Sequence, residues 1–213
     1  MNNPERVTEA DAQVTFSFKQ VEAMLAELFR VPNAKRPTLV GRLQQLQKLS
    51  LPLGTNVGRG KRVTYETWQL AELALYLDLL DVGITPAALS AHFGQSPFYP
   101  TLKMCNEAHA LEYAKPAIVA VIYFAALDGL RTTENKGAHQ ILLTPRPEDV
   151  IIAITENSGV VVNLSVRLRM LKQAASAVLK DQSFISIFSA PDDLESRGYL
   201  VAGESTLISV GER

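Results

Sequence analysis

Cysteine and histidine are scarce in this chain of 213 residues, and their scarcity limits its chemistry. One cysteine, Cys105, excludes an internal disulfide and a cysteine-rich metal site, and it suits a reducing compartment. None of the three histidines, His92, His109 and His139, has a second ligand at metal-binding spacing. We therefore expect no metal and no cofactor. One catalytic alternative is a thiol and imidazole pair, because Cys105 and His109 would share a face if both lay on one helix.

Long apolar runs are absent as well. The longest uncharged apolar segment, residues 116–127, has twelve residues, whereas a membrane-spanning helix needs about 20. The first thirteen residues carry acids where a secretory signal would need a basic and then an apolar run. These features predict a cytoplasmic protein without a membrane segment. Its composition, 47% hydrophobic and 20% charged, is that of a folded globular chain.

The motifs of common enzymes are also missing. The chain has no Walker loop, dinucleotide fingerprint, nucleophile-elbow serine or paired-carboxylate pattern. Gly58 and Gly60 are spaced like part of a phosphate-binding loop, but no helix start follows them at the required distance. We therefore predict that the protein is not an enzyme.

Acidic residues are absent from one long internal window, residues 30–65. Eight of the 21 Lys and Arg residues fall inside it and all 22 acidic residues fall outside, so the rest of the chain has a net charge of −9 although the whole chain has −1. Such a concentration of positive charge favours a polyanionic partner. The alternatives are a solvated cationic face without a partner and a surface that binds an acidic protein.

The centre of this window has the spacing of a short amphipathic helix that starts at Thr38. Four leucines share one face: Leu39, Leu43, Leu46 and Leu49. The opposite face carries Gly41, Gln44, Gln45 and Lys48, with Arg42 at its flank. The pattern predicts a helix that buries its leucines and presents amide and basic side chains to solvent.

A glycine-punctuated basic loop follows this helix. Pro52 and Gly54 end the helix, and residues 58–62 read GRGKR. Because β-favouring residues flank this turn at position 57 and at positions 63–65, we expect a two-stranded ribbon, or wing, with the basic turn at its tip. A helix sized for the major groove beside a cationic ribbon is an arrangement that reads DNA.

Three more helices are expected around these elements. A first helix is capped at Thr15 or Ser17, with Gln20 in capping-box position. Its buried stripe, which would pack on the leucine face of the Thr38 helix, consists of Phe18, Val21, Met24, Leu25 and Leu28. An apolar helix over residues 66–82 forms the centre of the core, and a short helix follows over residues 86–93.

The order of these parts resembles the winged-helix DNA-binding domain of MerR-type transcriptional regulators. The resemblance covers about residues 15–93, and the matching positions are Arg42 and Leu43 in the reading helix, residues 49–52 at its end, residues 59–65 in the wing and residues 80–89 after the core helix. In that family the wing leads into a tyrosine, which is Tyr65 here. The resemblance implies a winged helix-turn-helix fold that binds double-stranded DNA.

Some features depart from the family pattern. The turn over residues 29–38 is longer than in the family, and the sequence Leu-Gln-Gln at positions 43–45 replaces paired aromatic residues. The family's long coiled-coil helix is broken here by Gly94, Pro97 and Pro100. The family's mode of dimerisation and its effector therefore do not transfer to this chain.

The C-terminal half has a different texture, with short runs rich in Val and Ile. We expect strands over residues 117–126, 140–143, 150–155 and 159–163, the last two forming a hairpin. A covering helix then starts near Leu164, capped by Asn163 or Ser165. The predicted fold class is α+β, with a flexible arm over residues 1–13, a winged helix-turn-helix domain over 14–93, a connector over 94–115, a small sheet-and-helix domain over 116–181 and a partly ordered tail over 182–213.

Together these features predict a sequence-specific transcriptional regulator that binds double-stranded DNA as a homodimer, with a small-molecule or protein effector on its C-terminal domain. Arg42 and Gln45 are the expected base-reading residues. The expected phosphate contacts are Lys35, Arg36, Lys48, Arg59, Lys61 and Arg62, with the Thr38 hydroxyl near the helix start and, by resemblance, Tyr65. One alternative is an architectural or excisionase-like DNA-bending or adaptor protein. Another is an enzyme with its site in the C-terminal sheet.

Overall fold

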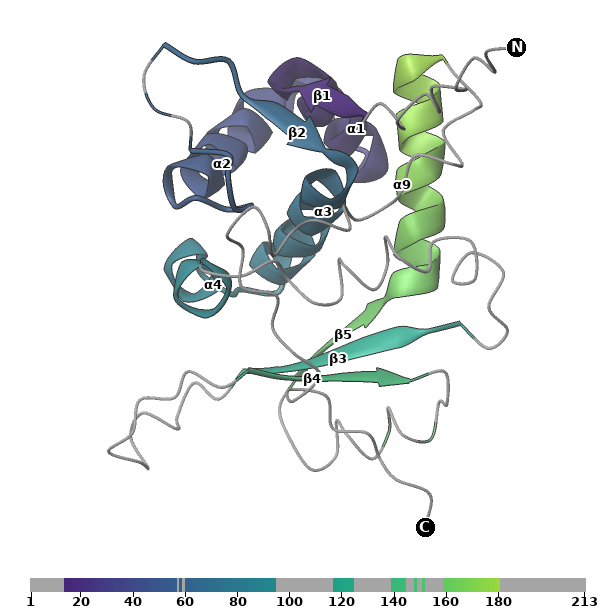
Figure 1. Cartoon of the computed structure of the whole chain (residues 1–213). Coiled ribbons are helices and arrows are strands. Elements are labelled where there is room, and N and C mark those ends of the chain that lie inside the picture. The colour runs from purple at the N-terminus through teal and green to yellow at the C-terminus, as the bar shows by residue number, and fades with distance from the viewer. Residues whose placement is uncertain are drawn as a thin grey trace, which may run out of the picture.

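The computed structural model describes residues 14–56, 58, 60–94, 117–124, 139–144, 148, 151 and 159–180. The predicted arm, nearly all of the predicted connector and the predicted tail lie outside these residues. The described chain combines helices with two small antiparallel sheets, which agrees with the α+β class (Figure 1).

Helix α1 (Phe18–Leu28) starts at the predicted capping box. The Ser17 hydroxyl accepts a hydrogen bond from the Gln20 backbone N–H at 3.4 Å, and the Gln20 side-chain oxygen accepts one from the Ser17 N–H at 2.9 Å. These two reciprocal bonds satisfy backbone donors that the first helical turn leaves free. The expected stripe is buried, with Phe18 half-buried at its edge.

Helix α2 (Arg36–Lys48) follows a single 3₁₀ turn, η1 (Asn33–Lys35). It begins two residues before the predicted start, because Pro37 fits the first turn of a helix, where its missing N–H costs nothing. Three of the four predicted leucines, Leu39, Leu43 and Leu46, are buried in the core shared with α1. The predicted amphipathic helix is thus confirmed.

The strand after the basic loop pairs differently from the prediction. Strand β2 (Thr64–Glu66) pairs antiparallel with β1 (Thr15–Ser17), which lies directly before α1. The other flank of the expected ribbon, position 57, lies outside the described residues, and residues 51–56 before it are not in a strand. Leu51, Pro52 and Thr55 in this segment are buried.

Helix α3 (Thr67–Asp81) is the central core helix that the sequence predicts. Every residue from position 67 to position 77 is buried, so the helix is covered on several sides. Gly83 follows it with a φ of 95°, a left-handed conformation that favours glycine at a helix end. Helix α4 (Pro86–Phe93) starts where expected, with the Thr85 hydroxyl accepting a hydrogen bond from the Ala88 N–H at 3.2 Å.

The C-terminal sheet has the order β4-β3-β5, and both of its ladders are antiparallel. Its strands are β3 (Val119–Phe124), β4 (His139–Thr144) and β5 (Gly159–Asn163). The expected hairpin partner of β5, residues 150–155, lies outside the described residues except for Ile151, which is helical. Strand β5 pairs with β3, whose alternate residues Ala120 and Ile122 belong to the core cluster.

Helix α9 (Leu164–Leu179) joins the two halves of the molecule. The Asn163 side chain caps it by accepting a hydrogen bond from the Val166 N–H at 3.0 Å. It lies against α1 and also contacts α3 (Figure 1). Its buried residues Leu168 and Leu171 belong to the same apolar cluster as those of α1, α2 and α3. The core is therefore continuous across the boundary between the two predicted domains.

Candidate nucleic-acid interface

Helix α2 presents an uncovered polar face. The residues of this face, all exposed, are Gly41, Gln44, Gln45 and Lys48. A Cβ atom placed on Gly41 would meet no atom within 4 Å, so none of the described residues packs over this position of the helix. The buried leucines on the opposite side hold the helix to α1 and leave this face open to a partner.

Five basic side chains on and near α2 have no acidic partner among the described residues. They are exposed and form no ion pair there: Lys35, Arg42, Lys48, Lys61 and Arg62. Arg36 differs, because its Nη1 atom lies 3.5 Å from a carboxylate oxygen of Glu22 on α1. Arg36 therefore links α1 to α2, and part of its charge is already neutralised.

The basic loop is anchored before and after its tip. Before the tip, the Gln47 amide donates to the Thr55 carbonyl at 3.2 Å, and the Thr55 hydroxyl donates to the Pro52 carbonyl at 2.7 Å. At the tip, Gly58 and Gly60 have φ values of 81° and 83°, a conformation that side-chain-bearing residues rarely adopt. Lys61 and Arg62 are exposed in a loop whose base is fixed.

Gln69, in the first turn of α3, connects the two ends of this loop. Its side-chain nitrogen donates to the Leu53 carbonyl at 2.6 Å, and its side-chain oxygen accepts from the Glu66 N–H at 2.9 Å. Its side chain is buried, so these bonds are shielded from water. Gln47 and Gln69 were not among the predicted site residues. Gln69 lies three residues after Glu66 in a capping-box pattern, which is the one local signal that could have identified it.

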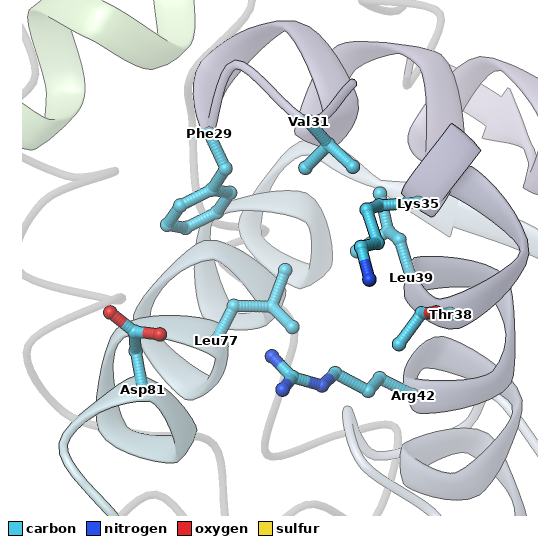
Figure 2. Close-up of a pocket in the computed structure, with 8 residues that line it drawn as sticks. All are labelled: Phe29, Val31, Lys35, Thr38, Leu39, Arg42, Leu77 and Asp81. Carbon is cyan, nitrogen blue, oxygen red and sulfur yellow. The ribbon is translucent and has the colours of Figure 1, made fainter. Parts of the chain in front are cut away.

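Arg42 and Lys35 point over a hollow beside the polar face. Figure 2 shows both side chains extending from the α2 region over this hollow toward Leu77, with Asp81 on the opposite wall. The hollow lies between the end of α1, the start of α2 and the end of α3 and has a volume of about 420 Å³. The structure therefore places Arg42 at the rim, whereas Gln45 and Lys48 lie in the centre of the exposed face.

Tyr65 is not part of the surface, and the prediction that it contacts DNA is wrong. Only 2% of it is exposed, and its ring lies 6.4 Å from the ring of Phe18. Burial raises the pKa of its hydroxyl to about 12. Tyr65 is the inward-facing residue of β2, where the alternation of a strand places it in the core. Of the other predicted contacts, Thr38 is exposed near the start of α2, and Arg59 lies outside the described residues.

Among the described residues, no group of three His, Cys, Asp or Glu side chains could hold a metal ion, and no helix is long and apolar enough to span a membrane. Cys105 and His109, the alternative catalytic pair, lie outside the part of the chain that the structure describes. No known family model and no curated protein matches the sequence.

Proposed function

We propose that the protein is a sequence-specific DNA-binding regulator of transcription that places α2 in the major groove and its basic loop along the phosphate backbone. The observation that carries this proposal is the uncovered polar face of α2, flanked by five cations that have no acidic partner among the described residues. An α-helix with its side chains is about 10–12 Å in diameter, and the major groove is about 12 Å wide, so α2, with 13 residues, fits into the groove.

In this proposal, Gln45 and Arg42 contact the bases. The Gln45 amide can bond adenine in bidentate fashion, and the Arg42 guanidinium can do the same with guanine. Gln45 is exposed in the centre of the face. Arg42 is exposed at its flank, so its long side chain has to swing from the rim of the hollow toward the bases.

The residues that contact phosphates in this proposal are Lys35, Lys48, Lys61 and Arg62, together with the Thr38 hydroxyl near the start of α2. Arg59, between the two loop glycines, joins this set by its position in the sequence. The hydrogen bonds of Gln47 and Gln69 fix the base of the loop, so less conformational entropy is lost when its cations meet a backbone.

The finer fold that fits this function is a MerR-like winged helix-turn-helix, with α1 and α2 as the two helices and the basic loop leading into β2 as the wing. The C-terminal sheet and α9 would then serve self-association or binding of an effector. In a homodimer, two copies of α2 would lie about 34 Å apart on an inverted repeat.

The test of this proposal is selection of bound sequences from a random pool of duplexes, followed by titrations at several salt concentrations. Two copies that neutralise about eight phosphates should lose on the order of ten-thousandfold in affinity between 50 and 200 mM salt. We expect an enriched inverted-repeat motif and this steep dependence. A pool without enrichment, together with a flat salt response, would exclude the proposal.

Substitutions separate the two kinds of contact. Arg42→Gln should relax the sequence preference, whereas Lys61→Gln should weaken binding to all duplexes about equally and lower the salt slope of the homodimer by about 2, which is about 1 for each copy. Lys19→Gln is the matched control, because Lys19 is an exposed lysine on α1, outside the α2 face and the loop. If Arg42→Gln and Lys61→Gln have the same effect on preference, the division between base and phosphate contacts is wrong.

A further inference from the structure

The hollow beside α2 is lined partly by apolar and partly by polar side chains. Its apolar lining consists of Phe29, Val31, Leu39 and Leu77. Its polar lining consists of Lys35, Thr38, Arg42 and Asp81. A volume of about 420 Å³ lies within the range of about 300–1,000 Å³ that is typical of small-molecule pockets.

Both charged residues that line the hollow on the α2 side, Lys35 and Arg42, are positive. Lys35 and Arg42 both extend over the hollow (Figure 2), and neither forms an ion pair with any described residue. Two cations directed at one space repel each other, and a bound anion would relieve that repulsion. Asp81 lies on the far wall, so the negative end of a ligand is directed toward α2.

The apolar wall is held from behind by the C-terminal half of the chain. The Arg167 guanidinium of α9 lies 5.0 Å from the centroid of the Phe29 ring, and Arg167 also pairs with Asp78 of α3. Phe29 therefore has a neighbour that restrains its ring before a ligand arrives.

We propose that this hollow binds a small amphipathic carboxylate whose aromatic or branched aliphatic body packs on Phe29, Val31 and Leu77 and whose carboxylate meets Arg42 and Lys35. A guanidinium binds a carboxylate through two parallel hydrogen bonds, and the Lys35 ammonium adds a second positive charge. A bare phosphate would satisfy the cations but leave the apolar wall in contact with water, so an acid with an apolar body fits the lining better.

Occupancy of this site would also regulate the proposed function, and this consequence rests on that function. A carboxylate that holds Arg42 over the hollow withdraws it from base readout and neutralises Lys35. The bound acid therefore weakens sequence-specific DNA binding, and by reciprocity the operator weakens binding of the acid.

The binding arm of the test uses the full chain, isothermal titration calorimetry and three probes: 3-phenylpropanoate, its neutral amide 3-phenylpropanamide, and acetate. We expect the acid to bind about tenfold more tightly than the amide, and acetate to show no measurable binding. Equal binding of acid and amide would overturn the proposal. Binding of acetate as tight as that of the aromatic acid would also overturn it, since it would indicate an adventitious ion only.

Substitutions in the lining of the hollow test whether the acid binds there. Arg42→Gln should remove the advantage of the acid over the amide, and Val31→Ser should weaken both by a similar factor. Lys19→Gln is the matched control for loss of one positive charge, because Lys19 is exposed near the start of α1 whereas Phe29 follows its end. If Lys19→Gln reduces acid binding as much as Arg42→Gln does, the acid responds to net charge and the assignment to this hollow is wrong.

The regulatory arm measures affinity for the selected duplex with and without saturating 3-phenylpropanoate. We expect a several-fold loss of affinity in the wild type and none in Arg42→Gln. If the wild type binds the acid but its DNA affinity is unchanged, the regulatory role is wrong while the site stands. If no duplex is bound at all, the proposed function fails, and the calorimetric comparison still decides whether the site exists.

Discussion

The surroundings of Asp78 act on the pKa of its carboxyl group in opposite directions. Burial raises the pKa of Asp78, its ion pair with Arg167 lowers it, the nearby Asp81 raises it, and the net result is a pKa raised from 3.8 to about 6. Burial therefore outweighs the ion pair. This agrees with the general finding that desolvation of a buried ion pair offsets much of its Coulombic attraction.

This pKa predicts how stability changes with pH. Because the folded-state pKa lies above the unfolded one, the contribution of Asp78 is fully present below about pH 4 and is lost as pH rises through 6. The size of the effect is on the order of 3 kcal/mol. In urea unfolding at pH 4, 5, 6 and 7, the stability advantage of the wild type over Asp78→Asn should shrink as pH rises. An advantage that grows with pH would mean that Arg167 controls the carboxylate.

Tyr65 gives a second prediction at this scale, which separates a core residue from a DNA contact. Tyr65→Phe should keep stability within about 1 kcal/mol, since the ring is retained, whereas Tyr65→Ala should cost about 3–5 kcal/mol. Duplex affinity of Tyr65→Phe, measured alongside chemical unfolding, should equal that of the wild type. A drop in duplex affinity without loss of stability would mean that the Tyr65 hydroxyl contacts DNA.

At the scale of elements, the basic loop is held by side chains from the helices on both sides of it. Gln47 of α2 bonds the Thr55 carbonyl, and Gln69 of α3 bonds both Leu53 and Glu66. Glycines permit the turn, but these amides decide where it lies. The position of the loop therefore depends on side chains of α2 and α3 as well as on the sequence of the loop itself.

Gln69→Leu should release the loop. The substitution leaves the Leu53 carbonyl and the Glu66 N–H without their side-chain partner, at a cost of about 1–3 kcal/mol. Trypsin cleavage after Arg59, Lys61 and Arg62 should become faster, and affinity for all duplexes should fall about equally. Gln69→Glu, which keeps the acceptor but loses the donor, should fall between Gln69→Leu and the wild type.

Exposed Gln173 on α9 provides the control, because Gln173→Leu makes the same chemical change outside the loop. If Gln69→Leu is cleaved no faster than Gln173→Leu under conditions where both are folded, the loop is not held by Gln69. The proteolysis result does not depend on DNA binding.

At the scale of the whole molecule, the core formed by the described residues is a continuous cluster that includes both halves of the chain. Helix α9 lies after the sheet in the chain, yet its leucines pack with those of the N-terminal helices, and Arg167 adds contacts to Asp78 and Phe29. The two halves of the chain are therefore expected to unfold together.

The single tryptophan, Trp68, reports on this coupling because it lies buried in α3. Leu171→Ala in α9 should cost about 2–5 kcal/mol and lower the denaturant midpoint observed by Trp68 fluorescence. Gln173→Ala, on the exposed side of α9, should leave that midpoint unchanged. An unchanged midpoint in Leu171→Ala would show that the two halves unfold independently.

Local patterns predicted the helices of the N-terminal half well. The Ser17 capping box, the leucine face of α2, the apolar helix α3 and the Thr85 cap all depend on residues within a few positions of one another. Pairing of strands was predicted less well. Strand β2 pairs with β1, almost fifty residues earlier, and β5 pairs with β3, which no local signal near Val160 or Val162 indicates.

The sequence by itself determined which segments of the N-terminal half form helices, which of their faces are apolar, and that positive charge without acids gathers around α2. These properties follow from spacing and from side-chain chemistry along a short stretch of chain. Only the tertiary structure decided that Tyr65 is buried, that Arg36 is paired with Glu22, that Arg42 and Lys35 share a hollow, and that α9 completes the core of the N-terminal half. These outcomes depend on contacts between residues far apart in the chain, and such contacts form only when the helices and sheets pack together.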